Sequence, residues 1–348
     1  MTRHIRDGRV ALAGATCVAA LLGAAALSSL SCSGPTVSAF GEIDDVVIVA
    51  GSTAAGRAVA LLDDALSAEG TWLLGEEHFK THVVGIRELG DYTYRRNLVI
   101  LGTWEDSEAA RVVNSRVGGI AEGDRPRPRS VEDIWGEGQV VTALMADSEK
   151  ELVEYISSNG EDVVAELVDA IRTRLARKLE EELESTGFDA EMRDRFGWSL
   201  GPPAGYGLHT SKESEGLVFF RKTAPDRTIF VHWEQGAPGD VTDEFMIEKR
   251  NEIGALYFDG DAVERRRELV FERTELAGLP ALRMSGWWGN RELIGGGPFR
   301  SYCVHVPWQG RTYMVDAALF APADDKTPLM RNLDAALQTF RPAAAGTR

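Results

Sequence analysis

The chain has 348 residues, with 38 Lys and Arg against 54 Asp and Glu, which gives a formal net charge of −16 at neutral pH. So acidic a protein is repelled by phosphate backbones and by anionic lipid surfaces, which excludes nucleic acid as an expected partner and also excludes membrane binding through basic patches. Single hydrophobic cores seldom grow beyond about 250–300 residues, so this length predicts two packed cores.

Residues 1–31 have the pattern of an export signal. Arginines precede a small, apolar run over residues 10–30, and Cys32 follows almost at once. An Ala- and Gly-rich run that closes on a cysteine predicts a lipoprotein signal peptide, after whose removal Cys32 carries acyl chains. A simple signal peptide cleaved nearby and a retained membrane anchor are the alternatives, since about 20 apolar residues suffice to span a bilayer.

Acylation of Cys32 would attach the protein to a membrane that it never crosses. We therefore expect a cell-envelope protein, lipid-anchored at the outer membrane and facing the periplasm, because Ser33 rather than Asp follows Cys32. With Cys17 in the signal, Cys303 is the only thiol expected in the folded body. Neither an intramolecular disulfide nor a structural zinc site is expected from these cysteines.

The folded part is predicted to be an α+β protein in two halves. After a tether over residues 32–44, residues 45–147 alternate strands and helices in the order βαββαβ, which is typical of a ferredoxin-like domain. The expected strands lie at 45–50, 82–87, 97–101 and 139–145, with helices at 54–66 and 106–117.

Linking helices are predicted over residues 148–186, with an interruption at Asn159-Gly160. Their charged side is interpreted as a solvated face rather than a binding surface for a partner helix. Residues 187–342 then predict an antiparallel sheet backed by helices, and residues 343–348 form a tail.

Gly51 to Gly56 follow a strand and open a helix, which is the setting of a phosphate-binding loop. Arg57 and Ala58 stand where that motif needs Lys and Ser or Thr. An ordinary strand-to-helix turn is therefore the favoured interpretation, and a nucleotide is not expected as a ligand.

Two further groupings of reactive residues are only weak indications of a functional site. Glu77, His78 and His82 could form a metal-ligating face on a helix, but the β-branched residues that follow favour a strand, so no metal is expected. Cys303 and His305 share one face of a probable strand, where a lone cysteine is usually a small buried hydrophobe. With no serine-nucleophile elbow and no carboxylate pair readable from spacing, we expect no catalytic residue and no cofactor.

A segment rich in Trp and Gly is the candidate binding site. Trp287, Trp288, Asn290, Arg291 and Phe299 could form an aromatic platform with a polar rim for sugar rings or for a partner's backbone. The alternative is that the tryptophans fill the core while the glycines allow a tight turn and close strand approach.

Several short segments resemble one known family. They are Phe79-Lys80-Thr81-His82, Arg96 to Ile100, Ile134-Trp135-Gly136 ahead of Gln139-Val140-Val141, Pro202 to Tyr206, Gly286-Trp287-Trp288, Gly296 to Phe299, and Ala321-Pro322 with the final helix. Together they resemble the bacterial lipoprotein family known as domain of unknown function 4837, over nearly the whole chain after the signal. The resemblance implies an envelope address, and it implies no activity, cofactor or catalytic residue.

Two functions from different classes remain at this point. The first is a non-catalytic binding or envelope-maintenance module, which holds a protein or glycan partner through its second half. The alternative is an envelope hydrolase that acts on a glycan or on peptidoglycan, and it requires a pocket in which carboxylates or histidines converge. The missing catalytic constellation favours the binding module and leaves enzymatic activity open.

Overall fold

The computed structural model describes residues 37–52, 56–69, 78–238 and 241–345. The expected signal peptide, Cys32 and the start of the tether lie outside these residues. Among the helices that the structure describes, none is long and apolar enough to span a membrane.

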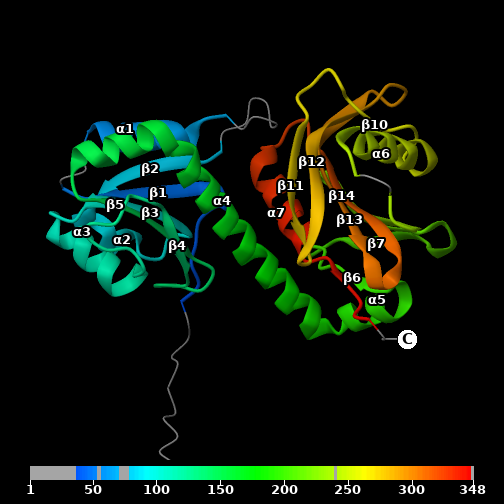
Figure 1. Cartoon of the computed structure of the whole chain (residues 1–348), viewed down its shortest axis with the longest axis horizontal. Coiled ribbons are helices and arrows are strands. Elements are labelled where there is room, and N and C mark those ends of the chain that lie inside the picture. Colours follow the sequence, from blue (N-terminus) through cyan, green and yellow to red (C-terminus); the bar gives the residue numbers. More distant parts are fainter. Residues whose placement is uncertain (1–36, 53–55, 70–77, 239–240, 346–348) are drawn as a thin grey trace, which may run out of the picture. The chain divides into compact units, whose positions relative to one another are not determined.

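The N-terminal half is a five-stranded sheet in the order β2-β1-β3-β5-β4 (Figure 1). Its strands are β1 (Asp45–Ala50), β2 (Lys80–Gly85), β3 (Asn97–Thr103), β4 (Arg129–Glu132) and β5 (Val140–Ala146). Four of them, β2, β1, β3 and β5, pair in parallel, and only β4 runs antiparallel, alongside β5.

Helices cover both faces of this sheet. One face packs against α1 (Arg57–Ser67) and α4 (Glu149–Thr186), and the other against α2 (Leu89–Tyr92) and α3 (Ser107–Val112). Every residue of β3 and β5 is buried as a result. Strands buried on both faces consist of continuous apolar runs, as these do, rather than of alternating apolar and polar residues.

The expected ferredoxin-like arrangement is therefore wrong for this half. A ferredoxin-like sheet is antiparallel, whereas here β1, β2 and β3 are joined by crossovers that bring each strand back in the same direction. The order of elements was nearly correct, but it does not fix strand direction. The uninterrupted apolar runs were the signal for a parallel sheet covered on both sides.

Helix α4 contains the predicted interruption. Ser148 caps its start by accepting a hydrogen bond of 3.3 Å from the Glu151 backbone N–H. Asn159 leaves the helical conformation, with φ −140°, and its side-chain amide donates to the Tyr155 carbonyl. Gly187 ends the helix in the left-handed conformation and leads into α5 (Phe188–Phe196).

The C-terminal half is built on an eight-stranded antiparallel sheet in the order β10-β12-β13-β14-β9-β8-β7, with β11 paired to β12. Its strands are β7 (Gly207–Lys212), β8 (Leu217–Lys222), β9 (Asp226–Gln235), β10 (Ala262–Val263), β11 (Val270–Leu276), β12 (Leu279–Asn290), β13 (Gly295–Val306) and β14 (Arg311–Phe320). A separate two-stranded sheet pairs β6 (Trp198–Ser199) with β15 (Arg341–Pro342).

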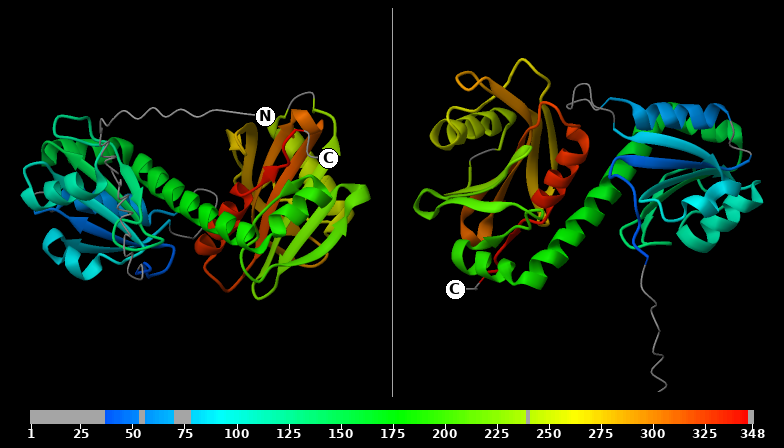
Figure 2. Two further views of the ribbon diagram at one scale, coloured as in Figure 1. Left: turned by 90° about the horizontal axis from the view of Figure 1, so that it is seen from below. Right: turned by 180° about the vertical axis from the view of Figure 1, so that it is seen from behind.

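Helices back this sheet on both sides, as Figure 2 shows for α6 (Asp243–Tyr257) and α7 (Lys326–Gln338). The α7 face buries a core that includes Tyr302, Tyr313 and Phe340. The α6 face buries a second core that includes Phe230 and Phe299. Helices with both a parallel and an antiparallel sheet confirm the predicted α+β class.

Candidate functional site

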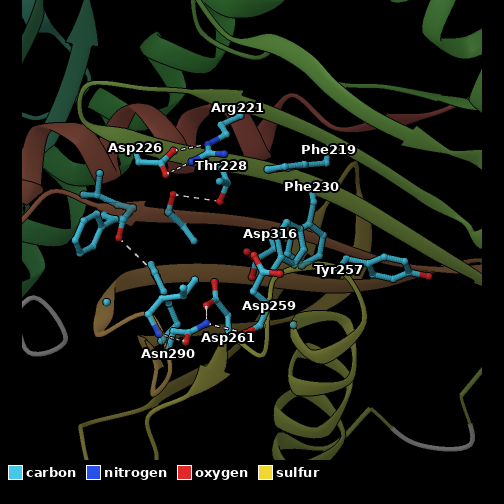
Figure 3. Close-up of a pocket in the computed structure, with 18 of the residues that line it drawn as sticks. Phe219, Arg221, Asp226, Thr228, Phe230, Tyr257, Asp259, Asp261, Asn290 and Asp316 are labelled. Carbon is cyan, nitrogen blue, oxygen red and sulfur yellow. Dashed lines mark hydrogen bonds and ion pairs between the residues drawn. The ribbon is translucent and has the colours of Figure 1, made fainter.

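A cavity of about 360 Å³ opens on the α6 face of the C-terminal sheet (Figure 3). Six aromatic side chains line it, namely Phe219, Phe230, Tyr257, Phe258, Trp288 and Phe320. Four carboxylates and two guanidinium groups line it as well, those of Asp226, Asp259, Asp261, Asp316, Arg221 and Arg250. Its size, and a wall that combines aromatic rings with charged groups, are compatible with a small-molecule site.

A buried ion pair lies at the base of this cavity. Arg250, on α6, places its Nε atom 2.9 Å from Oδ2 of Asp316 on β14, and the two side chains are 6% and 0% exposed. The guanidinium carbon lies 3.8 Å from the ring centroid of Phe299. The hydroxyl of Ser301 also donates to Oδ2 of Asp316. The pair therefore joins α6 to β13 and β14 underneath the cavity.

The second carboxylate oxygen of Asp316 has no hydrogen-bond partner. Oδ1 is buried, and Asp316 lines the cavity beside Phe230 (Figure 3). Burial raises the pKa of Asp316 above its ordinary value, although Arg250 and the Ser301 hydroxyl act to lower it. A buried acceptor without a donor is costly, so this oxygen is a point at which a ligand that donates a hydrogen bond would be stabilised.

The loop after α6 supplies Asp259 and Asp261. Gly254 allows it to pack against the helix, because a Cβ atom there would lie 1.9 Å from the Asp261 carbonyl oxygen. Burial raises the pKa of Asp261; the Asn290 amide and Arg250 lower it, and the charges of Asp259 and Asp316 raise it further. At this loop the electrostatics disfavour additional negative charge.

Asn290, at the end of β12, fixes that loop in place. Its amide nitrogen donates to the Asp259 carbonyl oxygen at 2.9 Å and to Oδ1 of Asp261 at 2.8 Å. Its amide oxygen accepts from the backbone N–H groups of Glu292 and Leu293. All these bonds hold the hairpin between β12 and β13 against the loop, so Asn290 positions Asp261.

A second Arg–Asp pair lines the same cavity but is solvated. Nε of Arg221 lies 2.8 Å from Oδ1 of Asp226, and NH2 lies 2.6 Å from Oδ2, with side chains 40% and 32% exposed. Its bidentate geometry neutralises the charge of Asp226. The other two carboxylates of the cavity, those of Asp259 and Asp261, form no such ion pair with a guanidinium group within the part of the chain that the structure describes.

The structure brings together only part of the residues predicted to bind. Trp288 and Asn290 line the cavity, and the indole N–H of Trp288 donates to the Leu319 carbonyl at 3.3 Å. Trp287 alternates to the other face of β12, where the Arg267 guanidinium carbon lies 4.2 Å from its ring centroid. Arg291 is exposed, and Phe299 is fully buried beneath Arg250. Ligand binding by these five residues stays a prediction.

The glycines of the same segment permit close strand approach, as the alternative interpretation proposed. A Cβ atom at Gly297 would lie 1.9 Å from the Leu319 carbonyl oxygen of β14. Leu293 and Ile294, at the tip of this hairpin, are 68% and 91% exposed. The hairpin of β12 and β13 therefore contains both glycines that allow close strand packing and residues that line the cavity.

The other candidate motifs have structural roles in the described residues. The Ser52 hydroxyl donates to Oδ2 of Asp106 at 2.8 Å, so the turn after β1 already holds a carboxylate; residues 53–55 of that turn lie outside the described residues. His82 lies on β2 with its Nε2 atom 3.3 Å from the Tyr92 hydroxyl. No group of three or more potential metal ligands occurs among the described residues, and Glu77 lies outside them.

Cys303 is a buried side chain of the core on the α6 face. Burial raises the pKa of its thiol to about 12, so the thiolate required of a nucleophile is disfavoured at neutral pH. The imidazole Nδ1 of His305 lies 3.2 Å from the hydroxyl of Thr312.

Sequence reasoning missed Asp261, Asp316 and Arg250. Asp316 interrupts the apolar run of β14, and a lone charge in a buried strand was a readable signal. Asp259 and Asp261 stand two apart around Gly260, in a segment rich in Gly and Asp. Nothing in the spacing of these residues indicated that the two segments meet.

Comparison of the chain with known proteins gives one family match. The model described as "Domain of unknown function (DUF4837)" matches residues 185–339, which include the cavity. The resembling segments at 79–82, 96–100 and 134–141 lie outside the matched range. No curated protein matches the sequence.

Several solved structures share partial similarity with the chain. LpqN, involved in cell envelope biogenesis of Mycobacterium tuberculosis, is 14% identical with a TM-score of 0.29 over 42% of this chain and 83% of LpqN. The Saccharomyces cerevisiae Ran-binding protein Mog1p is 8% identical with a TM-score of 0.31 over 42% and 90%. PA94 from Pseudomonas aeruginosa, a protein of unknown function and putative regulator, is 12% identical with a TM-score of 0.27 over 40% and 99%.

The family match falls on the half of the chain where the resemblance was most specific, the Gly-Gly-Pro-Phe segment at 296–299 and the hairpin after it. Residues 185–339 of this chain are therefore similar to the family described as a domain of unknown function 4837.

Proposed function

We propose that this protein is a non-catalytic binding module of the cell envelope, and that the cavity of its C-terminal half holds a sugar ring of an envelope glycan. The observation that carries this proposal is the unpartnered, buried Oδ1 atom of Asp316, a residue that lines a cavity together with six aromatic side chains. Sugar hydroxyls donate to carboxylates, and the apolar face of a sugar ring packs on aromatic side chains.

The cavity wall supports a saccharide more than a purely apolar ligand. Trp288 and Phe320 lie with ring centroids 6.5 Å apart, and Phe320 is 38% exposed. Carboxylates at Asp226, Asp259 and Asp261 add acceptors around the same space. An apolar ligand would leave these acceptors desolvated without donors, which costs free energy at each of them.

Calorimetric titration of the full chain with neutral, acidic and amino oligosaccharides tests this proposal. Trp288→Ala should weaken binding by roughly fivefold to thirtyfold, because a stacked ring is worth about 1–2 kcal/mol. Trp308→Ala is the matched control, since Trp308 lies in the turn before β14 and does not line the cavity. Absence of binding across the whole panel, by a protein that is folded, would refute the proposal.

A glycan hydrolase is the second candidate function. Asp261 and Asp316 line one cavity, and burial raises the pKa of both. A carboxyl with a raised pKa is what a general acid needs for glycosidic cleavage, with a second carboxylate as base or nucleophile. New reducing ends that form from a bound glycan, and that disappear in Asp261→Asn and Asp316→Asn, would establish hydrolysis. Binding without any turnover would exclude it.

The envelope address rests on the N-terminal sequence. We propose that acyl chains on Cys32 hold the protein at the outer membrane, facing the periplasm, because the formal net charge of −16 opposes binding to anionic lipid. Cys32→Ser should move the protein out of the membrane fraction, while Cys17→Ser should leave it there. An unmodified Cys32 thiol, found by mass spectrometry of the mature protein, would contradict this.

A further inference from the structure

The charges that line the C-terminal cavity do not balance. Four carboxylates face two guanidinium groups and the imidazole of His209, which leaves an excess of two negative charges when His209 is neutral. Arg221 neutralises Asp226 and Arg250 neutralises Asp316. The excess therefore lies on Asp259 and Asp261, at the loop that Asn290 fixes against the hairpin.

Asp259, Asp261 and Asp316 line the same cavity. Burial is the main cause that raises the pKa of Asp261, and the negative charges of Asp259 and Asp316 add smaller effects in the same direction. Asp316 is 0% exposed and keeps its Oδ1 atom without a donor. An uncompensated buried acceptor beside a second carboxylate makes a site that a positive charge would stabilise.

We infer that the ligand of this cavity carries a protonated amine, with its ammonium group held between Asp261 and Asp316 and its carbon frame against the aromatic wall. This inference rests on the proposed function, under which the ligand is an amino sugar whose amino group is free. The three donors of an ammonium group match the acceptors available at Asp316 Oδ1 and at the Asp261 carboxylate. The rings of Phe230 and Trp288 add cation–π attraction.

The same features disfavour the other charged ligand classes. An anion would meet the excess negative charge, and both guanidinium groups of the cavity are already paired. A bare metal ion needs several oxygen ligands that converge on one point, and the described residues contain no such group. An organic cation uses both the carboxylates and the rings.

Binding of the amine should depend on pH through Asp261. The groups that face it are Arg250 on α6, Asp259 on its own loop, Asn290 on β12 and Asp316 on β14. Because the pKa of Asp261 is raised above 3.8, the carboxylate is present above that raised value and is lost as the pH falls through it. Affinity for the amine should decrease over the same interval, and bound ligand should lower the pKa.

The test uses the purified full chain and two matched probes, the fully deacetylated and the fully N-acetylated tetramer of β-1,4-linked glucosamine. These differ in the amine and its charge while they share the sugar frame. At pH 6.5 we expect the deacetylated tetramer to bind at least tenfold more tightly. Ethanolamine serves as a third probe, because it carries the ammonium group without a sugar ring.

Two variants connect the preference to the residues. Asp261→Asn should abolish the tenfold preference, because it retains a side chain of the same shape but carries no charge for the ammonium group. Asp324→Asn is the control, because Asp324 is exposed and does not line the cavity. Asp316→Asn is a second variant, which is tested provided that circular dichroism shows that it keeps the native secondary structure.

The outcomes separate the two proposals. Equal affinity for both tetramers, or a preference that survives Asp261→Asn, overturns the amine inference and leaves sugar binding intact. If ethanolamine binds as tightly as the deacetylated tetramer, the inference that the cavity binds an amine stands, but the proposal that it binds a sugar ring is contradicted. No binding of any of the three probes refutes both proposals.

Discussion

Removal of Arg250 should be among the most damaging single changes in the C-terminal half. The Arg250→Met variant leaves Asp316 as a fully buried carboxylate whose guanidinium partner, at 2.9 Å, is gone. Methionine keeps an unbranched stem over Phe299, so most of the packing is retained. The variant therefore tests the loss of the positive charge separately from the loss of packing.

The expected loss follows from the geometry of the pair. Leaving one partner of a buried ion pair uncompensated costs about 3–5 kcal/mol, and lost cation–π attraction with Phe299 adds about 0.5–2 kcal/mol. The Ser301 hydroxyl still donates to Asp316 and offsets part of this. We expect the free energy of unfolding to fall by about 4 kcal/mol at pH 7.

The loss should shrink in acid. Burial already raises the pKa of Asp316, and without Arg250 that pKa rises further. Above this raised pKa, the ionised carboxylate lowers the free energy of unfolding of the variant. As the pH falls through the raised pKa, the carboxylate of the folded variant takes up a proton and the free energy of unfolding increases. The difference from wild type should then decrease by up to about 1.4 kcal/mol per pH unit.

Urea unfolding of both proteins at pH 7 and pH 5, followed by tryptophan fluorescence, measures these differences. Arg221→Met is the matched control, because it removes a guanidinium from an exposed pair on the same cavity and should cost about 0–1 kcal/mol at both pH values. A loss below about 1 kcal/mol for Arg250→Met, or one that does not change with pH, would refute the reasoning.

Three further predictions concern other buried groups. Asp334→Asn should destabilise the protein by about 3–5 kcal/mol at pH 7, since it removes the buried carboxylate whose Oδ2 atom lies 2.5 Å from the Arg300 guanidinium; because the folded pKa of Asp334 is lowered, the wild-type contribution is present at neutral pH and is lost in acid, which urea titrations at pH 7 and pH 3 would reveal. Asn290→Ala should lower both the melting temperature and ligand affinity, because it frees the Asp261 loop; unchanged affinity in calorimetry would show that the loop needs no such support. Cys303 should not react with a thiol reagent at pH 8 until the protein unfolds in urea, and rapid labelling of the native protein would contradict its burial.

The sequence was sufficient to predict most of the elements, the kink and the fold class, although β4 (Arg129–Glu132) lies outside the expected strands. Periodicity and the helix-breaking pair Asn159-Gly160 placed α4 and its kink correctly, because both depend on local backbone preferences. Strand direction in the N-terminal half was missed. The choice between parallel and antiparallel pairing depends on which faces the helices cover, and only the continuous apolar runs of β3 and β5 carried that information.

The candidate site could be predicted only in part for a related reason. Trp288 and Asn290 were found because aromatic and glycine-rich composition is visible within one segment. Asp261 and Asp316 are 55 residues apart in the sequence. They line one cavity because the loop after α6 packs on the sheet that contains β14, and that packing is set by tertiary contacts such as those of Asn290.

Two buried aspartates in the same half show why Asp316 differs from a structural carboxylate. Asp334, on the α7 face, is 3% exposed, and burial alone would raise its pKa. Ion pairing lowers the pKa instead, because Oδ2 lies 2.5 Å from Nη1 of Arg300 and 3.9 Å from Nη1 of Arg172. The Tyr302 hydroxyl donates to Oδ1 at 2.8 Å. Both of its oxygens are occupied.

Asp316 is buried as deeply, yet its pKa is raised and one of its oxygens has no donor. Burial is common to both residues, so burial cannot account for the opposite shifts. The difference lies in the number of partners that the fold supplies, and the carboxylate left short of partners is the one that lines a cavity. Under the proposed function, a ligand would supply the donor that Asp316 lacks, whereas the protein itself supplies the donors of Asp334.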